Sequence, residues 1–106
     1  MASKQGTNVK SGTTEVTTAQ TAVRLVATTE VLTCVGVWVS ADPNNTGKCA
    51  VGDKNVNAKA TLGTFKGLLL DKEGKQTYFI EVTDPSTLWV DAEKSKDFVN
   101  WTAVLA

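Results

Sequence analysis

The sequence contains no histidine, and its 11 lysine and arginine residues balance its 11 aspartate and glutamate residues. The lack of histidine removes the commonest general base near neutral pH and the commonest side-chain metal ligand. The absence of net charge argues against nucleic acid and against an anionic membrane surface as partners. We therefore expect no cofactor, no metal site and no catalytic residue.

Long apolar runs and cysteines are scarce as well. No stretch of about 18 apolar residues is present to cross a bilayer, and the start, Met-Ala-Ser-Lys-Gln-Gly-Thr, lacks the apolar core of a secretion signal. We expect synthesis in the cytoplasm. The two cysteines, Cys34 and Cys49, are expected to be buried structural thiols. A disulfide between them, within one predicted hairpin, is the alternative.

The best-specified stretch is residues 31–41, followed by an Asp-Pro-Asn-Asn-Thr-Gly turn and a return over residues 48–52. Its odd positions are Val, Thr, Val, Val, Val and Ala, so one face of a strand here is an almost unbroken β-branched ridge. This ridge suits a sheet interior. Gly36, in the middle of the strand, predicts a β-bulge or a close approach of backbone.

Similar alternation recurs between turn-rich segments along residues 21–106, with no convincing helix. About seven short antiparallel strands are predicted, which indicates an all-β, single-domain β-sandwich or small barrel. Residues 1–20 are poor in apolar side chains and are predicted to be a flexible polar N-terminal arm. Such an arm can also become extended against a partner by adding to a sheet edge.

The acidic residues and the tryptophans are the remaining candidates for a site. The aspartates and glutamates fall mostly in predicted turns beside lysines, where solvated side chains are expected, and no spacing suggests a paired acid and base. Trp101 alternates with inward positions and is predicted to be in the core. Trp38 and Trp89 are predicted to point outward, either as a contact patch or covered by the arm, by a loop or by each other.

The domain from about residue 21 onward resembles a small structural domain of tailed-bacteriophage virions, found among head decoration, cement and head-fibre proteins. The stretches that carry the likeness are residues 37–41 (Val-Trp-Val-Ser-Ala), 45–52 (Asn-Thr-Gly-Lys-Cys-Ala-Val-Gly), 70–75 (Leu-Asp-Lys-Glu-Gly-Lys) and 86–92 (Ser-Thr-Leu-Trp-Val-Asp-Ala).

This resemblance implies a non-enzymatic protein on the capsid surface of a virion, which binds the lattice of the major capsid protein and stabilises the head. It further implies a homo-oligomer, with a trimer favoured, in which Trp38 and Trp89 contact another subunit or partner. The arm is expected to contact the capsid through the following residues: Lys4, Asn8, Lys10, Thr13, Thr14, Thr17 and Thr18. The alternatives are a tail, baseplate or fibre component, and a receptor- or carbohydrate-binding module recognised by an exposed aromatic platform.

Overall fold

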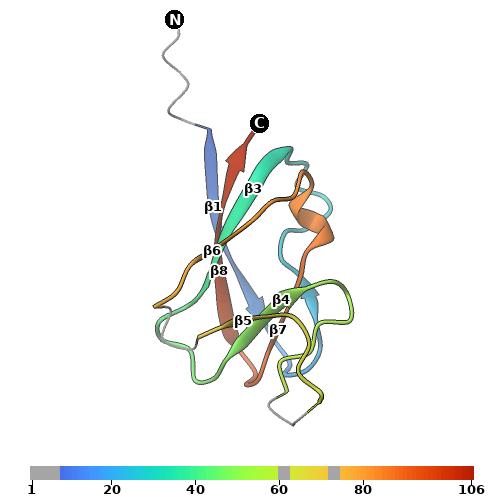
Figure 1. Ribbon diagram of the computed structural model, residues 1–106, viewed down its shortest axis with the longest axis vertical. Coiled ribbons are helices and arrows are strands. Elements are labelled where there is room, and N and C mark those ends of the chain that lie inside the picture. Colours follow the sequence, from blue (N-terminus) through green and yellow to red (C-terminus); the bar gives the residue numbers. More distant parts are fainter. Residues whose placement is uncertain (1–7, 60–62, 72–74) are drawn as a thin grey trace, which may run out of the picture.

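The structure is a computed structural model that describes residues 8–59, 63–71 and 75–106. These residues form eight strands and one short 3₁₀ helix (Figure 1). In chain order the elements are β1 (Val9–Val16), β2 (Val23–Arg24), β3 (Cys34–Ala41), β4 (Cys49–Gly52), β5 (Leu68–Leu70), β6 (Tyr78–Ile80), the 3₁₀ helix (Pro85–Thr87), β7 (Trp89–Ala92) and β8 (Asp97–Leu105).

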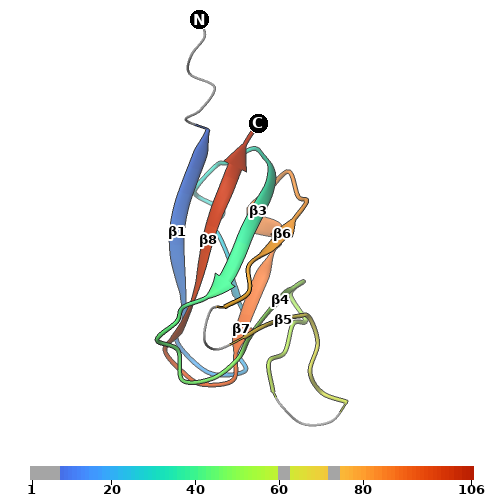
Figure 2. The same cartoon turned by 60° about the vertical axis from the view of Figure 1, so that its left-hand side comes forward.

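The strands make two antiparallel sheets that face each other across the core. One sheet has the order β1-β8-β3-β6 and the other the order β2-β7-β4-β5, and Figure 2 shows the first of them nearly face on. The predicted all-β sandwich is therefore confirmed, as two separate sheets. The β3 and β4 strands do not form the predicted hairpin, because the chain crosses from one sheet to the other between them.

The core lies between the sheets and is built mainly from valines at alternate positions. Val37 and Val39 of β3, Val90 of β7 and Val99 of β8 have no exposed surface. Removal of one such side chain from water stabilises a fold by roughly 1.5–3 kcal/mol. Trp101 is 6% exposed, which confirms its predicted place in the core.

A β-bulge interrupts the valine ridge where the sequence predicted it. The register between β3 and β8 shifts between Cys34 and Gly36. An extra residue at a bulge reverses the alternation on its N-terminal side. As a result Val35 is 53% exposed, whereas Cys34 is buried. Val31 precedes the strand and is 88% exposed. The predicted inward face is correct only from Val37 onward.

The segment 9–16 differs most from expectation. It was predicted as part of a flexible arm outside the domain, but β1 pairs with β8 along its whole length, from Val9 opposite Val104 to Val16 opposite Asp97. Val16 is fully buried. The backbone ladder along the long β8 strand replaces the apolar burial that this polar segment lacks. Residues 1–7, and with them Lys4, lie outside the described residues.

Candidate functional site

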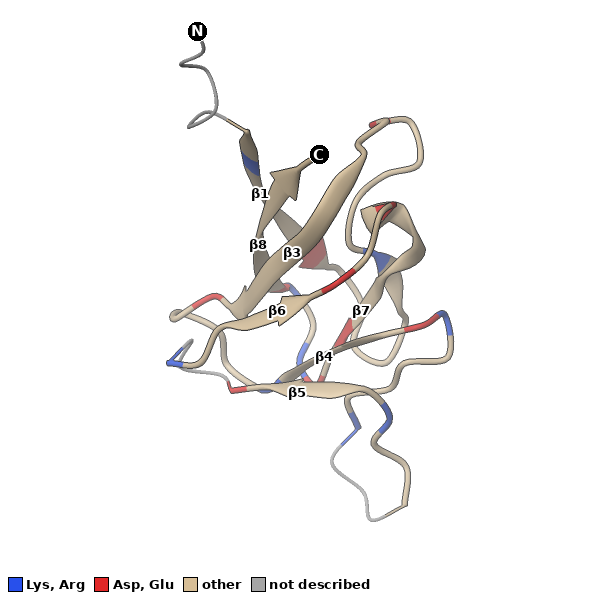
Figure 3. Ribbon diagram, turned by 45° about the horizontal axis from the view of Figure 1, so that its top comes forward, with Lys and Arg blue, Asp and Glu red and all other residues tan. Residues whose placement is uncertain are grey.

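The charged side chains are distributed in a way that does not mark a site. Figure 3 shows Lys and Arg interspersed with Asp and Glu, mostly in loops and at strand ends. Among the described residues, no three His, Cys, Asp or Glu side chains cluster in a way that would hold a metal ion. No described helix has the length and apolar character needed to span a membrane. The informative surfaces are a groove on one sheet and the free edge of the same sheet.

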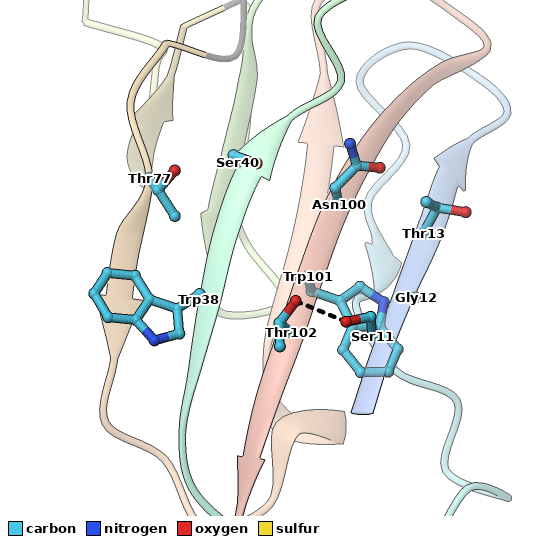
Figure 4. A pocket seen from close by; sticks show the side chains of 9 residues that line it. All are labelled: Ser11, Gly12, Thr13, Trp38, Ser40, Thr77, Asn100, Trp101 and Thr102. Carbon is cyan, nitrogen blue, oxygen red and sulfur yellow. Dashed lines mark hydrogen bonds between the residues drawn. The ribbon is translucent and has the colours of Figure 1, made fainter. Parts of the chain in front are cut away.

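The groove crosses the outer face of the sheet β1-β8-β3-β6. Because Val37 and Val39 point into the core, the alternate residues Trp38 and Ser40 project outward, and the same alternation holds in β8. The groove has a volume of about 420 Å³. Its lining, drawn in Figure 4, consists of Ser11, Gly12, Thr13, Trp38, Ser40, Thr77, Asn100, Trp101 and Thr102.

Strand register arranges the groove's side chains in two rows. Trp38 lies opposite Thr102, which lies opposite Ser11 on the other side of β8. In the next row Asn100 is flanked in the same way by Ser40 and Thr13. Cross-strand neighbours of this kind have Cβ atoms about 5 Å apart, and the two rows are separated by two residues of rise, or about 7 Å.

Trp38 forms one end of the groove and is held there by a second aromatic ring. Its indole is 44% exposed. The ring of Phe79 lies with its centroid 5.0 Å from that of Trp38, at an interplanar angle of 53°. Phe79 rests on Gly36, where any Cβ atom would overlap its ring. The missing side chain at the bulge thus provides the space for Phe79, and Phe79 supports Trp38.

The rest of the lining is uncharged and, apart from Gly12 and Trp101, polar. The hydroxyl groups of Ser11 and Thr102 are hydrogen-bonded to each other at 2.9 Å, as the dashed line in Figure 4 shows. Asn100 contributes a carboxamide whose Oδ1 is buried and has no partner among the described residues. Such an unpaired acceptor is uncommon in folded proteins. Neither row contains a carboxylate or a cationic group.

The second predicted contact residue, Trp89, lies in the other sheet and is half-buried. The guanidinium of Arg24 lies 4.7 Å from the centroid of its ring, and this arginine also donates a hydrogen bond of 2.6 Å to the Ser86 carbonyl oxygen. Trp89 packs in addition against a small cluster that includes Val56. Trp38 and Trp89 therefore do not form one patch. Of the alternatives that the sequence left open for Trp89, the structure shows the covered one, with Arg24 and a loop against the indole.

The residues predicted to form a capsid-contact arm are divided among different surroundings. Lys10 makes an ion pair of 3.2 Å with Glu30. The Thr14 hydroxyl points inward and donates to the Leu25 carbonyl oxygen at 2.5 Å, which ties β1 to the opposite sheet. Thr13 lines the groove. Asn8, Thr17 and Thr18 are exposed at the two ends of β1.

The outer side of β1 is an unpaired sheet edge. The Asn8 carbonyl accepts a hydrogen bond of 2.7 Å from the Leu105 N–H, so its backbone faces β8. In an antiparallel ladder every second residue faces the same way. The backbone groups of the residues in between therefore point away from the sheet: Val9, Ser11, Thr13 and Glu15. In the part of the chain that the structure describes, no strand pairs with this side.

The two cysteines are free and buried, which confirms the expected structural thiols and excludes the alternative disulfide. Cys34 donates to the Val82 carbonyl oxygen with an S–O distance of 3.0 Å. Burial, reinforced by the carboxylates of Asp97 and Asp91, raises the pKa of the Cys49 thiol to about 12. Thiols held in this state are poor nucleophiles.

Two aspartates expected to be solvated are instead buried. Asp97 is 4% exposed and accepts hydrogen bonds from the backbone N–H groups of Thr46 (3.0 Å) and Gly47 (2.9 Å). Asp91 has no exposed surface and accepts one from the Ala58 N–H at 2.8 Å. Both carboxylates thus anchor loops to β7 and β8. Sequence alternation carried a signal for Asp97, which is in phase with the inward residues of β8.

Comparison of the chain with protein-family models, with curated proteins and with solved structures gives no match. Its function must therefore be argued from the groove, the free edge of β1 and the resemblance described above.

Proposed function

We propose that the protein is a non-enzymatic structural protein of a bacteriophage virion, a decoration or cement protein that binds the lattice of major capsid protein. The resemblance of its β domain to small virion proteins supplies the class of partner. The single structural observation that supports the proposal is the free edge of β1, because an exposed strand edge is a ready surface for non-covalent attachment to another chain.

The attachment would take the form of strand addition. Val9, Ser11, Thr13 and Glu15 together offer four N–H donors and four carbonyl acceptors to an incoming extended segment. Each backbone hydrogen bond contributes a net 0.5–1.5 kcal/mol, so the full set is worth on the order of 8 kcal/mol. Association itself costs roughly 4–15 kcal/mol. One domain would therefore bind weakly, and firm attachment requires several linked copies.

This balance favours a homo-oligomer, with the trimer as our preferred state. Linked domains that meet a repeated lattice gain from effective concentration, so that weak single contacts give stable decoration. Of the two tryptophans, only Trp38 presents an open aromatic surface that a second subunit or partner can contact. The protein would be made in the host cytoplasm and reside on the capsid surface of the virion.

The test uses substitutions at Thr13, whose N–H points away from β8. Thr13→Pro removes this outward donor but no hydrogen bond of the β1–β8 ladder, whereas Thr13→Val keeps the donor and serves as the matched control. Deletion of residues 1–18 is less suitable, because it would also remove Val16 from the core. A separate deletion of residues 1–7 would test the contribution of Lys4 without touching β1.

The assay measures co-sedimentation of the purified protein with phage particles that lack it. We expect wild type and Thr13→Val to sediment with the particles and Thr13→Pro to bind at least tenfold more weakly, while all three unfold at similar temperatures. Equal binding of Thr13→Pro would exclude the β1 edge as the contact. Virions isolated from cells that produce the protein and found by mass spectrometry never to carry it would refute the virion role itself.

A further inference from the structure

We propose that the groove on the outer face of the β1-β8-β3-β6 sheet is a binding site for a neutral saccharide, with a sugar ring stacked on Trp38. The proposal goes beyond the attachment role and does not depend on it. A strand added at the β1 edge extends the sheet in its own plane and leaves the outer face open.

The chemistry of the lining selects an uncharged ligand that is rich in hydroxyl groups. Every side chain in the two rows that flank β8, other than Trp38, ends in a hydroxyl or a carboxamide. Hydroxyl groups both donate and accept hydrogen bonds, and a carboxamide offers both functions on separate atoms. Among the residues that the structure describes, no lysine or arginine lines the groove, so phosphates and acidic sugars would find no cation in this part of it.

Trp38 supplies the apolar surface that such a ligand also needs. A pyranose ring has one face of C–H groups, and an indole offers a broad flat surface on which this face can rest. Trp38 is well exposed and is braced by Phe79 at 5.0 Å between ring centroids. Little side-chain freedom therefore remains to be lost when a ring stacks on it. Figure 4 shows the indole at one end of the groove, where it extends from β3 toward β6, with Thr102, Asn100 and Ser11 on the other side of β3.

The spacing of the rows fits a ligand with several hydroxyl groups. Thr102 lies opposite Trp38 in the β3–β8 register, so a saccharide with one ring stacked on the indole would reach the Thr102–Ser11 hydroxyl pair by extending across β3. Asn100, in the second row, holds the unpartnered Oδ1, and rotation of its carboxamide would direct this acceptor to a sugar hydroxyl. The volume of about 420 Å³ lies within the range of roughly 300–1,000 Å³ that is usual for small-ligand sites.

The experiment starts with the full-length protein on an array of neutral and acidic glycans. Neutral glycans that bind are then titrated as free oligosaccharides by calorimetry against four proteins. These are wild type, Trp38→Ala, Thr102→Val and the control Val35→Ala, which removes an exposed apolar group of β3 outside the groove. Circular dichroism and gel filtration with light scattering report fold and oligomeric state for each protein.

We expect binding of neutral glycans, weakened at least tenfold by Trp38→Ala. Thr102→Val should weaken it about threefold to tenfold, the equivalent of one hydrogen bond, and Val35→Ala should leave it unchanged. Absence of binding to every neutral glycan would refute the proposal, as would affinity that is unchanged in Trp38→Ala. A change in oligomeric state in Trp38→Ala without saccharide binding by wild type would instead assign this face to a contact between subunits. Failure of the capsid assay would leave this result unaffected.

Discussion

The substitution Gly12→Ala tests whether residues 9–16, predicted as part of a flexible arm, are an integral strand of the domain. Gly12 lies in the middle of β1, directly opposite Trp101 of β8. A Cβ atom at this glycine would sit 2.5 Å from Cζ2 and 2.8 Å from Cε2 of the Trp101 indole. The ring is 6% exposed and belongs to the main core cluster. The glycine therefore leaves the space into which the indole extends.

The expected magnitude follows from two opposing effects. Relief of the overlap requires the ring or the strand to move by about 1 Å, and overpacking of this kind typically costs about 1–3 kcal/mol. Replacement of a strand glycine by alanine recovers roughly 0.5–1 kcal/mol of backbone entropy. The net prediction is a loss of about 1–1.5 kcal/mol, which lowers the melting temperature of a domain of this size by about 4–12 °C. In a flexible arm the same change would leave stability unaltered.

Chemical unfolding by urea measures this effect, and a second substitution isolates its cause. Phenylalanine at position 101 lacks the outer ring of the indole, so Gly12→Ala should cost at least 0.5 kcal/mol less in a Trp101→Phe background, a coupling of the size that residues in contact show. If Gly12→Ala destabilised the wild type and the Trp101→Phe variant equally, the loss of stability would not come from contact with the Trp101 ring. A neutral or stabilising Gly12→Ala would refute the strand assignment of residues 9–16.

Two further predictions concern buried polar groups. Asp97→Ala removes the acceptor of the Thr46 and Gly47 N–H groups. It should therefore lower the free energy of unfolding, measured by urea denaturation, by about 2–4 kcal/mol. An unchanged stability of the variant would mean that these N–H groups bind water instead. For Cys49 the folded-state pKa is raised from 9.0 to about 12, so the folded protein holds this proton more tightly than the unfolded chain. Stability should be unaffected below about pH 9 and fall as the pH rises toward 12; Cys49→Ala should show a shallower alkaline decline in pH-dependent thermal melts, and equal slopes would contradict the shift.

Local alternation predicted those parts of the fold in which one strand shows its two faces clearly. The inward positions of β8 are an example, since Trp101 was expected inside together with the residues that alternate with it, and Val99, Trp101 and Ala103 are all buried. The bulge at Gly36 was also predicted. Its effect on the preceding residues was not, because the pairing partner that defines the shift, Val104, lies near the other end of the chain. Alternation alone cannot place an extra residue.

Strand β1 and the β3–β4 connection show a second limit of prediction from the sequence. The hydrophobic pattern of residues 9–16 does not predict an integral strand of the domain, because the stabilising partner is the backbone of β8, which for the outermost pair, Val9 and Val104, is 95 residues away in sequence. Hydrogen bonds of that kind leave no trace in hydrophobic pattern. Equally, the turn between β3 and β4 resembles a hairpin turn locally, but the two strands belong to different sheets.

The candidate site combines one feature that local alternation predicts with others that depend on the pairing of distant strands. That Trp38 points outward follows from the alternation of β3 alone and was predicted from the sequence. That Thr102 and Ser11 stand in line with it depends on the register of three strands drawn from the beginning, the middle and the end of the chain. Each of these polar residues is unremarkable within its own strand, since the solvent-facing side of a sheet is ordinarily polar. They form one candidate binding surface only because the pairing register of β1, β8 and β3 places them side by side. The pairing of residues 9–16 with β8 as strand β1 therefore both closes the core over Trp101 and completes the groove beside Trp38.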